Sequence, residues 1–317
     1  PVRVARLLAT DSTITVTSPP VVVSRAEEVF ASATEHLLNV DRCDAVTFGP
    51  MQGDTPLAEA IRRAAQRSGL GTQLSERAAG VCTRFDLPAT FDDYMASLEK
   101  RQRGNLRRDM NQVAKHPQSR VRVVTDPAEI ASVFEQFITM HTAQWTAEGR
   151  PGHFGDWPRA GDFSREAVAA LAPLNRVALV GLEMDGVMVC WEWCYVLGSR
   201  SFWKLPARAV GSEWDKLGLG RLGMANMLQA MIGRGVREVE AGPGHYDYKC
   251  KHGATEHPFA SFLIVRNSLV SRVKVRCLER FSDLLHLAYY RAWRLKFAPK
   301  LGLKSGPLVR WWIRTRP

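Results

Sequence analysis

Ionisable side chains crowd the end of a short apolar run near residue 240. The run closes at Ala241, a Gly-Pro-Gly turn follows, and the titratable residues around that turn are Glu240, His245, Tyr246, Asp247, Tyr248 and Lys249. Carboxylate, imidazole, phenol and amine groups at a strand end are suited to moving protons and stabilising charge on a substrate. An ordinary polar turn is the alternative, but the density of titratable groups favours a functional site at residues 237–252.

A pair of glycines precedes a predicted apolar helix. Gly218 and Gly220 would let backbone N–H groups at the N-terminus of that helix approach a phosphate without a Cβ in the way. Glycines at this spacing also form ordinary turns. Their place between three predicted strands and a helix favours phosphate binding, and the residues expected at the ligand are Leu217, Gly218, Leu219, Gly220 and Arg221.

A basic helix is predicted from Thr90 to His116. Thr90-Phe-Asp-Asp93 resembles a capping box at its start, and Pro117 ends it. Lysine and arginine outnumber acidic residues in its middle, which predicts an anion-binding surface with Arg103, Arg107 and Arg108. A charged face in contact with water is the alternative.

Another helix is predicted after Asp126-Pro-Ala-Glu129, which has the residues typical of a helix start. Its apolar face ends in His141 and Trp145, and a glycine-rich loop at residues 149–154, able to cover a ligand, follows. Two interpretations are open for His141 and Trp145. They contact a substrate, or they pack in the core, which is the more common outcome for such residues.

These candidates need a frame of strands and helices. The N-terminal part alternates between strand and helix, with strand-like alternation in residues 1–20, a helix at 26–40, a strand at 45–48 and a helix at 57–68. From residue 176 the pattern indicates an antiparallel meander with strands at 177–183, 187–197 and 201–205. A methionine-rich helix, a strand at 236–241 and a strand at 259–265 follow.

In this order of elements the chain resembles the GNAT superfamily of N-acyltransferases, and more narrowly its Fem-like branch, which includes bacterial acetyltransferases linked to cellulose and exopolysaccharide synthesis. The resemblance rests on residues 91–108, on His141, Trp145 and the loop 149–152, on the meander, and on Asp247-Tyr-Lys249. It implies an α+β fold of tandem GNAT-like domains, with mixed, largely antiparallel sheets flanked by helices and a shortened N-terminal domain. The expected boundaries are 1–115, 116–270 and, for a basic amphipathic tail, 271–317.

The resemblance implies transfer of an acyl group to an amine, with acetyl-CoA or another acyl-CoA as co-substrate. Glu240 would be the base, directly or through water, and Tyr246 or Tyr248 would protonate the leaving thiolate. Lys249 would stabilise negative charge or orient an acidic acceptor. Trp203 would contact the acyl-CoA, and the residues at the acceptor would be Arg103, Arg107, Arg108, His141, Trp145, His245 and Tyr246. We expect Glu240, Tyr248 and Lys249 to line one pocket with Trp203 and His141.

One position departs from the GNAT pattern. Asp215 stands where members of the superfamily usually have a Gln or an Arg before the glycine pair. Arg103, Arg107 and Arg108 are therefore expected to supply the missing positive charge, either to a phosphate of the donor or to an anionic acceptor.

Three functions are compatible with these features. The first is acyl transfer from acyl-CoA to a small-molecule, glycan-linked or lipid-linked amine. The second is a Fem-type transferase that uses aminoacyl-tRNA, whose phosphates the basic helix and tail would bind. The third is a non-catalytic adaptor at a membrane or a polysaccharide-synthase complex. Binding of acetyl-CoA would separate the first from the other two.

Composition sets the remaining expectations. The chain of 317 residues, with 45% hydrophobic and 24% charged residues, has an ordinary globular composition. The sequence contains neither a membrane-spanning run nor a signal peptide, which predicts a cytoplasmic protein. Its six cysteines lack a disulfide spacing and are expected to be reduced. Cys250, His252 and His257 lack a second ligand pair, so no metal is expected.

The net charge of +11 is concentrated at the C-terminus. Between Ser271 and Pro317, twelve Lys and Arg residues stand against Glu279 and Asp283 alone. These cations are accompanied by apolar residues at helical spacing from Leu284 to Leu295 and by the pair Trp311-Trp312. This grouping predicts peripheral attachment of residues 271–317 to an anionic membrane surface, on the inner face of the membrane. Packing of the apolar residues 284–295 onto the second domain is the alternative.

Overall fold

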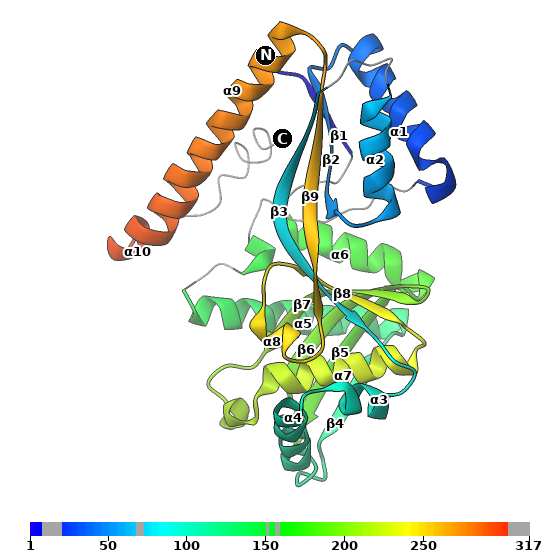
Figure 1. Ribbon diagram of the computed structural model, residues 1–317. Coiled ribbons are helices and arrows are strands. Elements are labelled where there is room, and N and C mark those ends of the chain that lie inside the picture. Colours follow the sequence, from blue (N-terminus) through cyan, green and yellow to red (C-terminus); the bar gives the residue numbers. More distant parts are fainter. Residues whose placement is uncertain (8–20, 68–72, 150–151, 156–158, 304–317) are drawn as a thin grey trace. The chain divides into compact units, whose positions relative to one another are not determined.

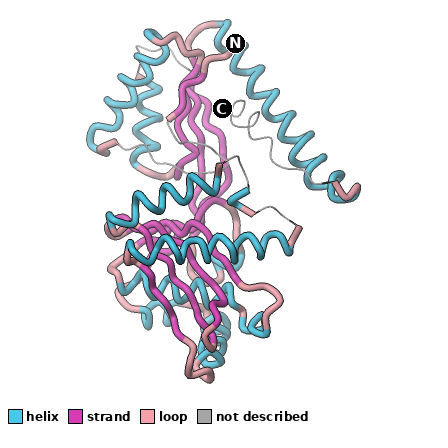
Figure 2. Tube along the Cα trace, turned by 180° about the vertical axis from the view of Figure 1, so that it is seen from behind, coloured by secondary structure: helices cyan, strands magenta, loops and turns pink. Residues whose placement is uncertain are grey.

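The computed structural model describes residues 1–7, 21–67, 73–149, 152–155 and 159–303 (Figures 1 and 2). Contacts between residues divide the chain into two compact units. Unit 1 comprises Pro1–Cys82 and His257–Pro317, and unit 2 comprises Thr83–Glu256. A division by contacts differs in kind from the domain boundaries that the family resemblance implies, and those boundaries stay a prediction.

Unit 1 is built on a sheet with helices on both faces. Its strands, in order along the sheet, are β1 (Val4–Arg6), β2 (Ala45–Gln52), β9 (Thr255–Val265) and β3 (Gln73–Asp86), and the last two continue into unit 2. β1 pairs parallel with β2, and β2 pairs antiparallel with β9. The helical segments are η1 (Val23–Arg25), α1 (Ala26–Glu35), the π-helical η2 (His36–Val40), α2 (Pro56–Gln66), α9 (Leu269–Leu285), the π-helical η6 (His286–Phe297) and α10 (Ala298–Lys300).

The alternation of β9 creates two small cores in unit 1. Phe262 and Ile264 point toward α1 and α2, where they meet Phe30 and Ile61. The alternate residues Leu263 and Val265 point the other way and pack with Val275 of α9. Each helix layer therefore buries one face of the same strand.

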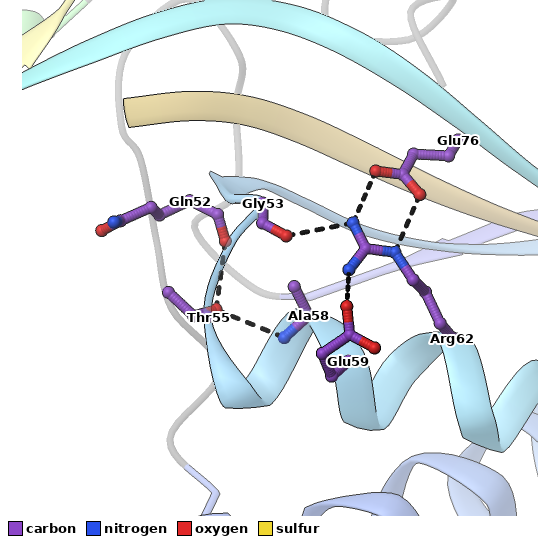
Figure 3. A network of polar contacts seen from close by, with 7 residues as sticks. All are labelled: Gln52, Gly53, Thr55, Ala58, Glu59, Arg62 and Glu76. Carbon is purple, nitrogen blue, oxygen red and sulfur yellow. Dashed lines mark hydrogen bonds and ion pairs between the residues drawn. The ribbon is translucent and has the colours of Figure 1, made fainter. Parts of the chain in front are cut away.

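Arg62 of α2 ties this helix to the sheet (Figure 3). Its guanidinium donates to the carboxylate of Glu76 on β3 at 2.7 and 2.9 Å, to the carbonyl of Gly53 at 3.0 Å, and to Glu59 one turn earlier. The hydrogen bond from Arg62 lowers the pKa of Glu76, while burial opposes the shift. The Thr55 hydroxyl caps the helix by accepting from the Ala58 N–H at 3.3 Å. The helix predicted at 57–68 is thus confirmed.

Unit 2 contains a larger mixed sheet. Its strand order is β3, β8 (Glu238–Pro243), β7 (Arg200–Arg208), β6 (Val187–Leu197), β5 (Val177–Met184) and β4 (Arg120–Val124). Strands β4 to β7 are antiparallel neighbours, and β7 pairs parallel with β8. The predicted meander is confirmed together with its turns, where Asp185, Gly186 and Gly198 have positive φ.

Helices cover both faces of this sheet, whose strands are apolar on both sides. On one side, the α7 face, lie α3 (Phe91–Ser97), α4 (Lys100–Val113) and α7 (Leu219–Gly233), over a core that includes Cys194 and Trp203. On the other side, the α5 face, lie α5 (Pro127–Ala147) and α6 (Ala160–Leu171), over Trp193 and Leu205. The short segments are η3 (His153–Gly155), η4 (Ala172–Leu174), η5 (Glu213–Leu217) and α8 (Asp247–Cys250).

The helix expected from Thr90 to His116 is in fact two helices. Leu98 has an extended backbone, with ψ 146°, and its side chain is buried, so the chain breaks between α3 and α4. Arg103 closes the break, because its guanidinium donates to the carbonyls of Ala96 and Leu98 at 2.9 and 3.3 Å. The cap at Thr90 is confirmed, since its hydroxyl accepts from the Asp93 N–H.

The predicted fold class is confirmed as mixed, largely antiparallel sheets flanked by helices. Strands β3 and β4 and helix α6 have no counterpart in the prediction. The first half of β3 is rich in exposed polar and small residues, so it lacks an apolar alternation that would reveal a strand. Across the part of the chain that the structure describes, no helix is long and apolar enough to cross a bilayer. Residues 8–20 and the pair Trp311-Trp312 lie outside the described residues.

Candidate active site

The pairing of two parallel strands of unit 2 ends at the candidate site. The pairing of β7 with β8 runs from Arg200 and Glu238 to Phe202 and Glu240 and ends there, although both strands continue. Trp203 is the next residue on β7, and Ala241 is the next on β8. Backbone groups and side chains just beyond this point are therefore available to a ligand or to other parts of the protein.

Lys249 on α8 fills this position. Its side chain is only 7% exposed, and its Nζ donates to the carbonyl of Ala241 at 2.5 Å. The ammonium group lies over three aromatic rings, at 4.2 Å from the ring centre of Tyr246, 4.9 Å from that of Trp203 and 5.9 Å from that of Tyr248. Burial lowers the pKa of Lys249 to about 8, and the negative charges of Glu240 and Glu192 oppose this shift.

Glu192 is a buried acid next to Trp203 in the candidate site. It lies in the middle of β6 with 1% exposure, and its carboxylate accepts from the indole N–H of Trp203 at 2.7 Å. Burial raises the pKa of Glu192 well above its ordinary value, against the opposing effects of the Trp203 hydrogen bond and the Lys249 charge. Sequence reasoning missed this residue, although one acid in the apolar run Val187–Leu197 is a signal that could have found it.

The close approach of α7 to Glu192 depends on a glycine. A Cβ on Gly223 would lie 2.3 Å from Glu192 Oε1, which is closer than side-chain atoms approach one another. The helix therefore presses directly on the carboxylate. Glu192 is held between Trp203 on one strand and the backbone of α7.

Glu240 and Tyr248 lie near Lys249 as the sequence predicted. Glu240 is half-buried and accepts from the Gly242 N–H at 3.1 Å. Tyr248 is partly exposed, and burial raises its pKa, with the negative charge of Glu192 adding to the shift. These two residues and Tyr246, whose ring contacts the ammonium group, surround Lys249. Their catalytic roles stay a prediction.

His252 anchors the loop that carries Lys249. The buried His252 ring is 2.6 Å from the carbonyl of Tyr248 through Nδ1, and the carbonyl of His252 accepts from the Tyr94 hydroxyl at 2.9 Å. At the exposed end of the loop, His245 lies within hydrogen-bond distance of Glu256 at 2.5 Å and Asp247 at 3.2 Å. The hydrogen bond with Glu256 raises the pKa of His245.

Polar side chains of the glycine-bearing loop and of the first turn of α7 form hydrogen bonds within the protein. Gly218 has the left-handed φ of +65° and precedes the helix Leu219–Gly233. Asp215 accepts from the Gly211 N–H at 2.9 Å and from the Ser212 hydroxyl at 3.1 Å. Arg221 donates to the buried Asp109 of α4 at 2.5 and 3.1 Å. Arg221 is therefore committed to an ion pair within the protein, and phosphate binding by this loop stays a prediction.

The three arginines of the basic helix have different environments. Arg103 is held by the break between α3 and α4. Arg107 is exposed, and Arg108 is exposed with its guanidinium 3.6 Å from Asp109. Arg107 and Arg108 are thus the better candidates for an anion, and their binding role stays a prediction.

His141 and Trp145 lie on the α5 face of the sheet. His141 is fully buried, with Nδ1 2.8 Å from the carbonyl of Pro206 and Nε2 3.0 Å from Nδ1 of His153. It stacks on Phe137 and contacts the ring of Trp145, so its packing follows the core interpretation. Trp203 belongs to the core of the α7 face. The prediction that His141 shares one pocket with Trp203 and Lys249 is therefore wrong, because the sheet separates their two clusters.

Among the described residues, no group of three or more His, Cys, Asp or Glu side chains is arranged to hold a metal ion. The chemistry that the arrangement does offer is electrostatic. A caged, buried cation lies at the end of a strand pair, with two acidic residues and two phenols around it. Such a cation stabilises an oxyanion strongly because little water competes with it.

Comparison with known proteins identifies the class of fold. Residues 100–250 match the family model of the acetyltransferase (GNAT) domain. Among solved structures, FemX is similar over 80% of this chain and 80% of its own, with 12% sequence identity and a TM-score of 0.55. The C-terminal domain of a putative lysylphosphatidylglycerol synthetase from Agrobacterium fabrum aligns over 80% of this chain and 76% of its own, with 11% identity and a TM-score of 0.49. No curated protein matches this chain in sequence.

The residues that match the acetyltransferase (GNAT) domain include the whole of β7, β8, α7 and α8. Lys249 and Glu192 both lie within the matched residues. The likeness to FemX, at 12% identity, concerns the fold alone.

Proposed function

We propose that this protein transfers an acyl group from an acyl-CoA to an amine, and that Lys249 stabilises the oxyanion formed on the way. The observation that carries the proposal is the buried Lys249 ammonium, caged by Tyr246 and Trp203 and placed where β7 and β8 part. The match of residues 100–250 to an acetyltransferase domain supports the reaction class.

The charge state of Lys249 supports this role. With a pKa of about 8, the side chain carries its proton in most molecules at neutral pH. When the nitrogen of the acceptor attacks the thioester carbon, the carbonyl oxygen becomes an oxyanion, and the nearby ammonium lowers the energy of that state. The carbon–sulfur bond then breaks as the carbonyl forms again.

Two further proton transfers complete the reaction. The attacking nitrogen gives its proton to Glu240, directly or through water, and the leaving thiolate takes a proton from the hydroxyl of Tyr246 or Tyr248. Burial raises the pKa of Tyr248, so its hydroxyl carries the proton that this step requires. In each turnover one amide forms, one thioester breaks, and one free thiol leaves.

The acceptor is an amine on a small molecule, a glycan or a lipid, and a role in cell-envelope or exopolysaccharide metabolism follows from the Fem-like resemblance. The exposed cations Arg107 and Arg108 are suited to an anionic acceptor or donor. They also favour a second candidate function, in which aminoacyl-tRNA is the donor, because exposed arginines bind nucleic-acid phosphates.

The experiment measures acyl transfer from acetyl-CoA, and separately from aminoacyl-tRNA, to a panel of amines. We expect the first donor to support turnover by the wild type, and Lys249→Met to reduce it by roughly 10²–10³-fold, as for the loss of an oxyanion donor. Turnover with aminoacyl-tRNA alone would move the function to the second candidate. Full activity of Lys249→Met with either donor would remove Lys249 from the mechanism.

The pH profile tests the role of Lys249 more sharply. With a weakly basic amine that is already deprotonated at pH 7, kcat/KM should fall as pH rises through about 8, because Lys249 loses its proton there. Lys249→Arg should keep its charge and shift this fall to higher pH. A rise in kcat/KM through the same range would instead show that Lys249 acts as a base.

A further inference from the structure

A long exposed helical segment follows the last strand of unit 1. Helix α9 continues through η6 and α10, so that Leu269–Lys300 is helical throughout, as the orange and red ribbon in Figure 1 shows. One side of α9 is anchored, because the Ser271 hydroxyl donates to Asp44 at 2.8 Å and Val275 packs against Ala45 and Val265. Ser282, two turns after Val275, is buried on the same side.

The opposite side of α9 exposes large apolar side chains. Leu269, Leu284 and Leu287 are 78%, 63% and 60% exposed. The residues that we call the apolar stripe recur at helical spacing and are Leu269, Val270, Val273, Phe281, Leu284 and Leu287. The exposed thiol of Cys277 lies within the stripe. Helix α9 therefore buries one face against the sheet of unit 1, while in the described structure the other face stays exposed.

Cations lie at the border of the apolar stripe and within it, because Arg280 comes four residues before Leu284 and so shares its side of α9. Arg276 and Arg280 are exposed on α9, and within the described residues they make no ion pair or hydrogen bond. Arg291, Lys296 and Lys300 continue the positive charge along η6 and α10. Of the two acids in this helical segment, Asp283 is paired with Arg77 at 2.5 Å. The exposed surface around the stripe is therefore strongly positive.

We propose that the apolar stripe and its cations form a docking surface for an anionic lipid bilayer, with α9 lying in the plane of the interface. An amphipathic helix of this kind buries its apolar side chains at the level of the headgroups while its cations contact lipid phosphates. The helix does not span the bilayer, which agrees with the absence of a spanning helix among the described residues. This inference is independent of the proposed catalytic function.

Charge favours a bilayer over two other occupants of this surface. In a dimer formed through the stripe, the Arg276 and Arg280 side chains of both copies would approach one another, and like charges repel. The C-terminal segment 304–317 contains Lys304, Arg310, Arg314 and Arg316 and contains no acid, so its charge does not complement the stripe either. Anionic lipid supplies both the apolar phase and the opposite charge.

The test is flotation of the intact chain with vesicles of phosphatidylcholine alone or with added phosphatidylglycerol. We expect recovery with anionic vesicles only, and we expect the double substitution Leu284→Glu and Leu287→Glu to reduce the partition coefficient roughly tenfold or more. Leu174→Glu with Leu197→Glu is the matched control, because both leucines are exposed in unit 2 and lie outside the stripe. Equal losses in the two double variants, or no binding by the wild type, would overturn the proposal.

A second measurement keeps the test independent of folding. An environment-sensitive fluorophore on Cys277, with Cys43 and Cys250 replaced by serine, should shift to the blue when anionic vesicles are added and should be quenched by nitroxide lipids. Reversal of charge at Arg276 and Arg280 should weaken this shift, more so at low salt. A blue shift that depends on protein concentration without vesicles would indicate a second copy on the stripe and would overturn the proposal.

Discussion

At the scale of single residues, the candidate site is defined by a buried cation and a buried acid that share one tryptophan. Trp203 presents its ring to Lys249 and its indole N–H to Glu192. Neither ionisable group has much access to water, so each is shifted toward its neutral form by burial. Their cost to stability is a measurable property of the protein, separate from any catalytic role.

Replacement of Lys249 by methionine should stabilise the protein while it removes activity. The pKa of Lys249 in the folded protein, about 8, lies below its ordinary value. The charged side chain that is present at pH 7 therefore destabilises the folded state relative to the unfolded chain. We expect the free energy of unfolding at pH 7 to rise by about 1 to 3 kcal/mol. Since the wild type gains stability as pH rises from 8 toward 10.5, the advantage of the variant should shrink over that range.

The control for this prediction is Lys251→Met, whose side chain is exposed and paired with Asp247. It should leave the free energy of unfolding within about 0.5 kcal/mol of the wild type. Urea denaturation at several pH values measures both variants. A loss of stability in Lys249→Met at pH 7 would mean that the cage stabilises the charge more than burial opposes it.

Glu192→Gln should also change how stability depends on pH, with a sign opposite to that of Lys249→Met. The pKa of Glu192 is raised by burial, so the folded protein keeps a proton that the unfolded chain releases above pH 4.5. The wild type therefore loses stability as pH rises above 4.5, and the variant avoids this loss while its amide oxygen can still accept from Trp203. We expect equal stability near pH 4.5 and an advantage of about 1 kcal/mol or more for the variant at pH 8. A difference that does not change with pH would contradict the burial of an ionisable acid.

At the scale of elements, α7 contains Gly223, a residue of low helix propensity, because the adjacent Glu192 carboxylate leaves no room for a Cβ. Gly223→Ala would normally favour a helix, but its Cβ would collide with the Glu192 carboxylate. We expect the substitution to reduce the free energy of unfolding by about 1 to 3 kcal/mol. Gly233→Ala, in the same helix and with open space around the new Cβ, should be neutral or stabilising by up to about 1 kcal/mol.

The difference between the two glycines can be measured by thermal or urea unfolding. If Gly223→Ala were as stable as Gly233→Ala, the close contact between α7 and Glu192 would be wrong. Combining Gly223→Ala with Glu192→Ala should recover part of the loss, because the smaller side chain makes room for the methyl group.

At the scale of the whole molecule, the candidate site and the proposed docking surface lie in different units. Lys249 and Glu192 lie in unit 2, whereas the apolar stripe lies in unit 1. We expect Leu284→Glu with Leu287→Glu to leave kcat/KM for a soluble amine within about twofold of the wild type, because both side chains are exposed and substitutions at the surface usually have small effects. With an amine carried on lipid in anionic vesicles, the same variant should be slower. Equal slowing with both acceptors would indicate a general defect in folding.

Local sequence signals predicted much of this protein because they depend on near neighbours. The caps at Thr90 and Asp126, the turn at Asp185-Gly186 and the alternation of the meander each follow from the conformation of a few residues. The segment around Lys249 was found in the same way, from titratable groups beside a glycine turn. The sequence by itself thus determined where most elements begin and which loop carries the candidate chemistry.

Tertiary structure alone decided which of those side chains meet. Leu98 breaks a helix whose charge pattern is continuous, and Arg221 pairs with Asp109, which lies far away in the sequence. The register between β6 and β7 shifts where Trp193 pairs with Leu205 and Cys194 pairs with Trp203. This shift helps to place Trp203 and Leu205 on opposite faces of the sheet. Trp203 therefore contacts Lys249, whereas His141 lies on the other face. Burial, and with it the altered pKa values of Glu192 and Lys249, depends on contacts between residues distant in the chain, and periodicity in sequence contains no information on such partners.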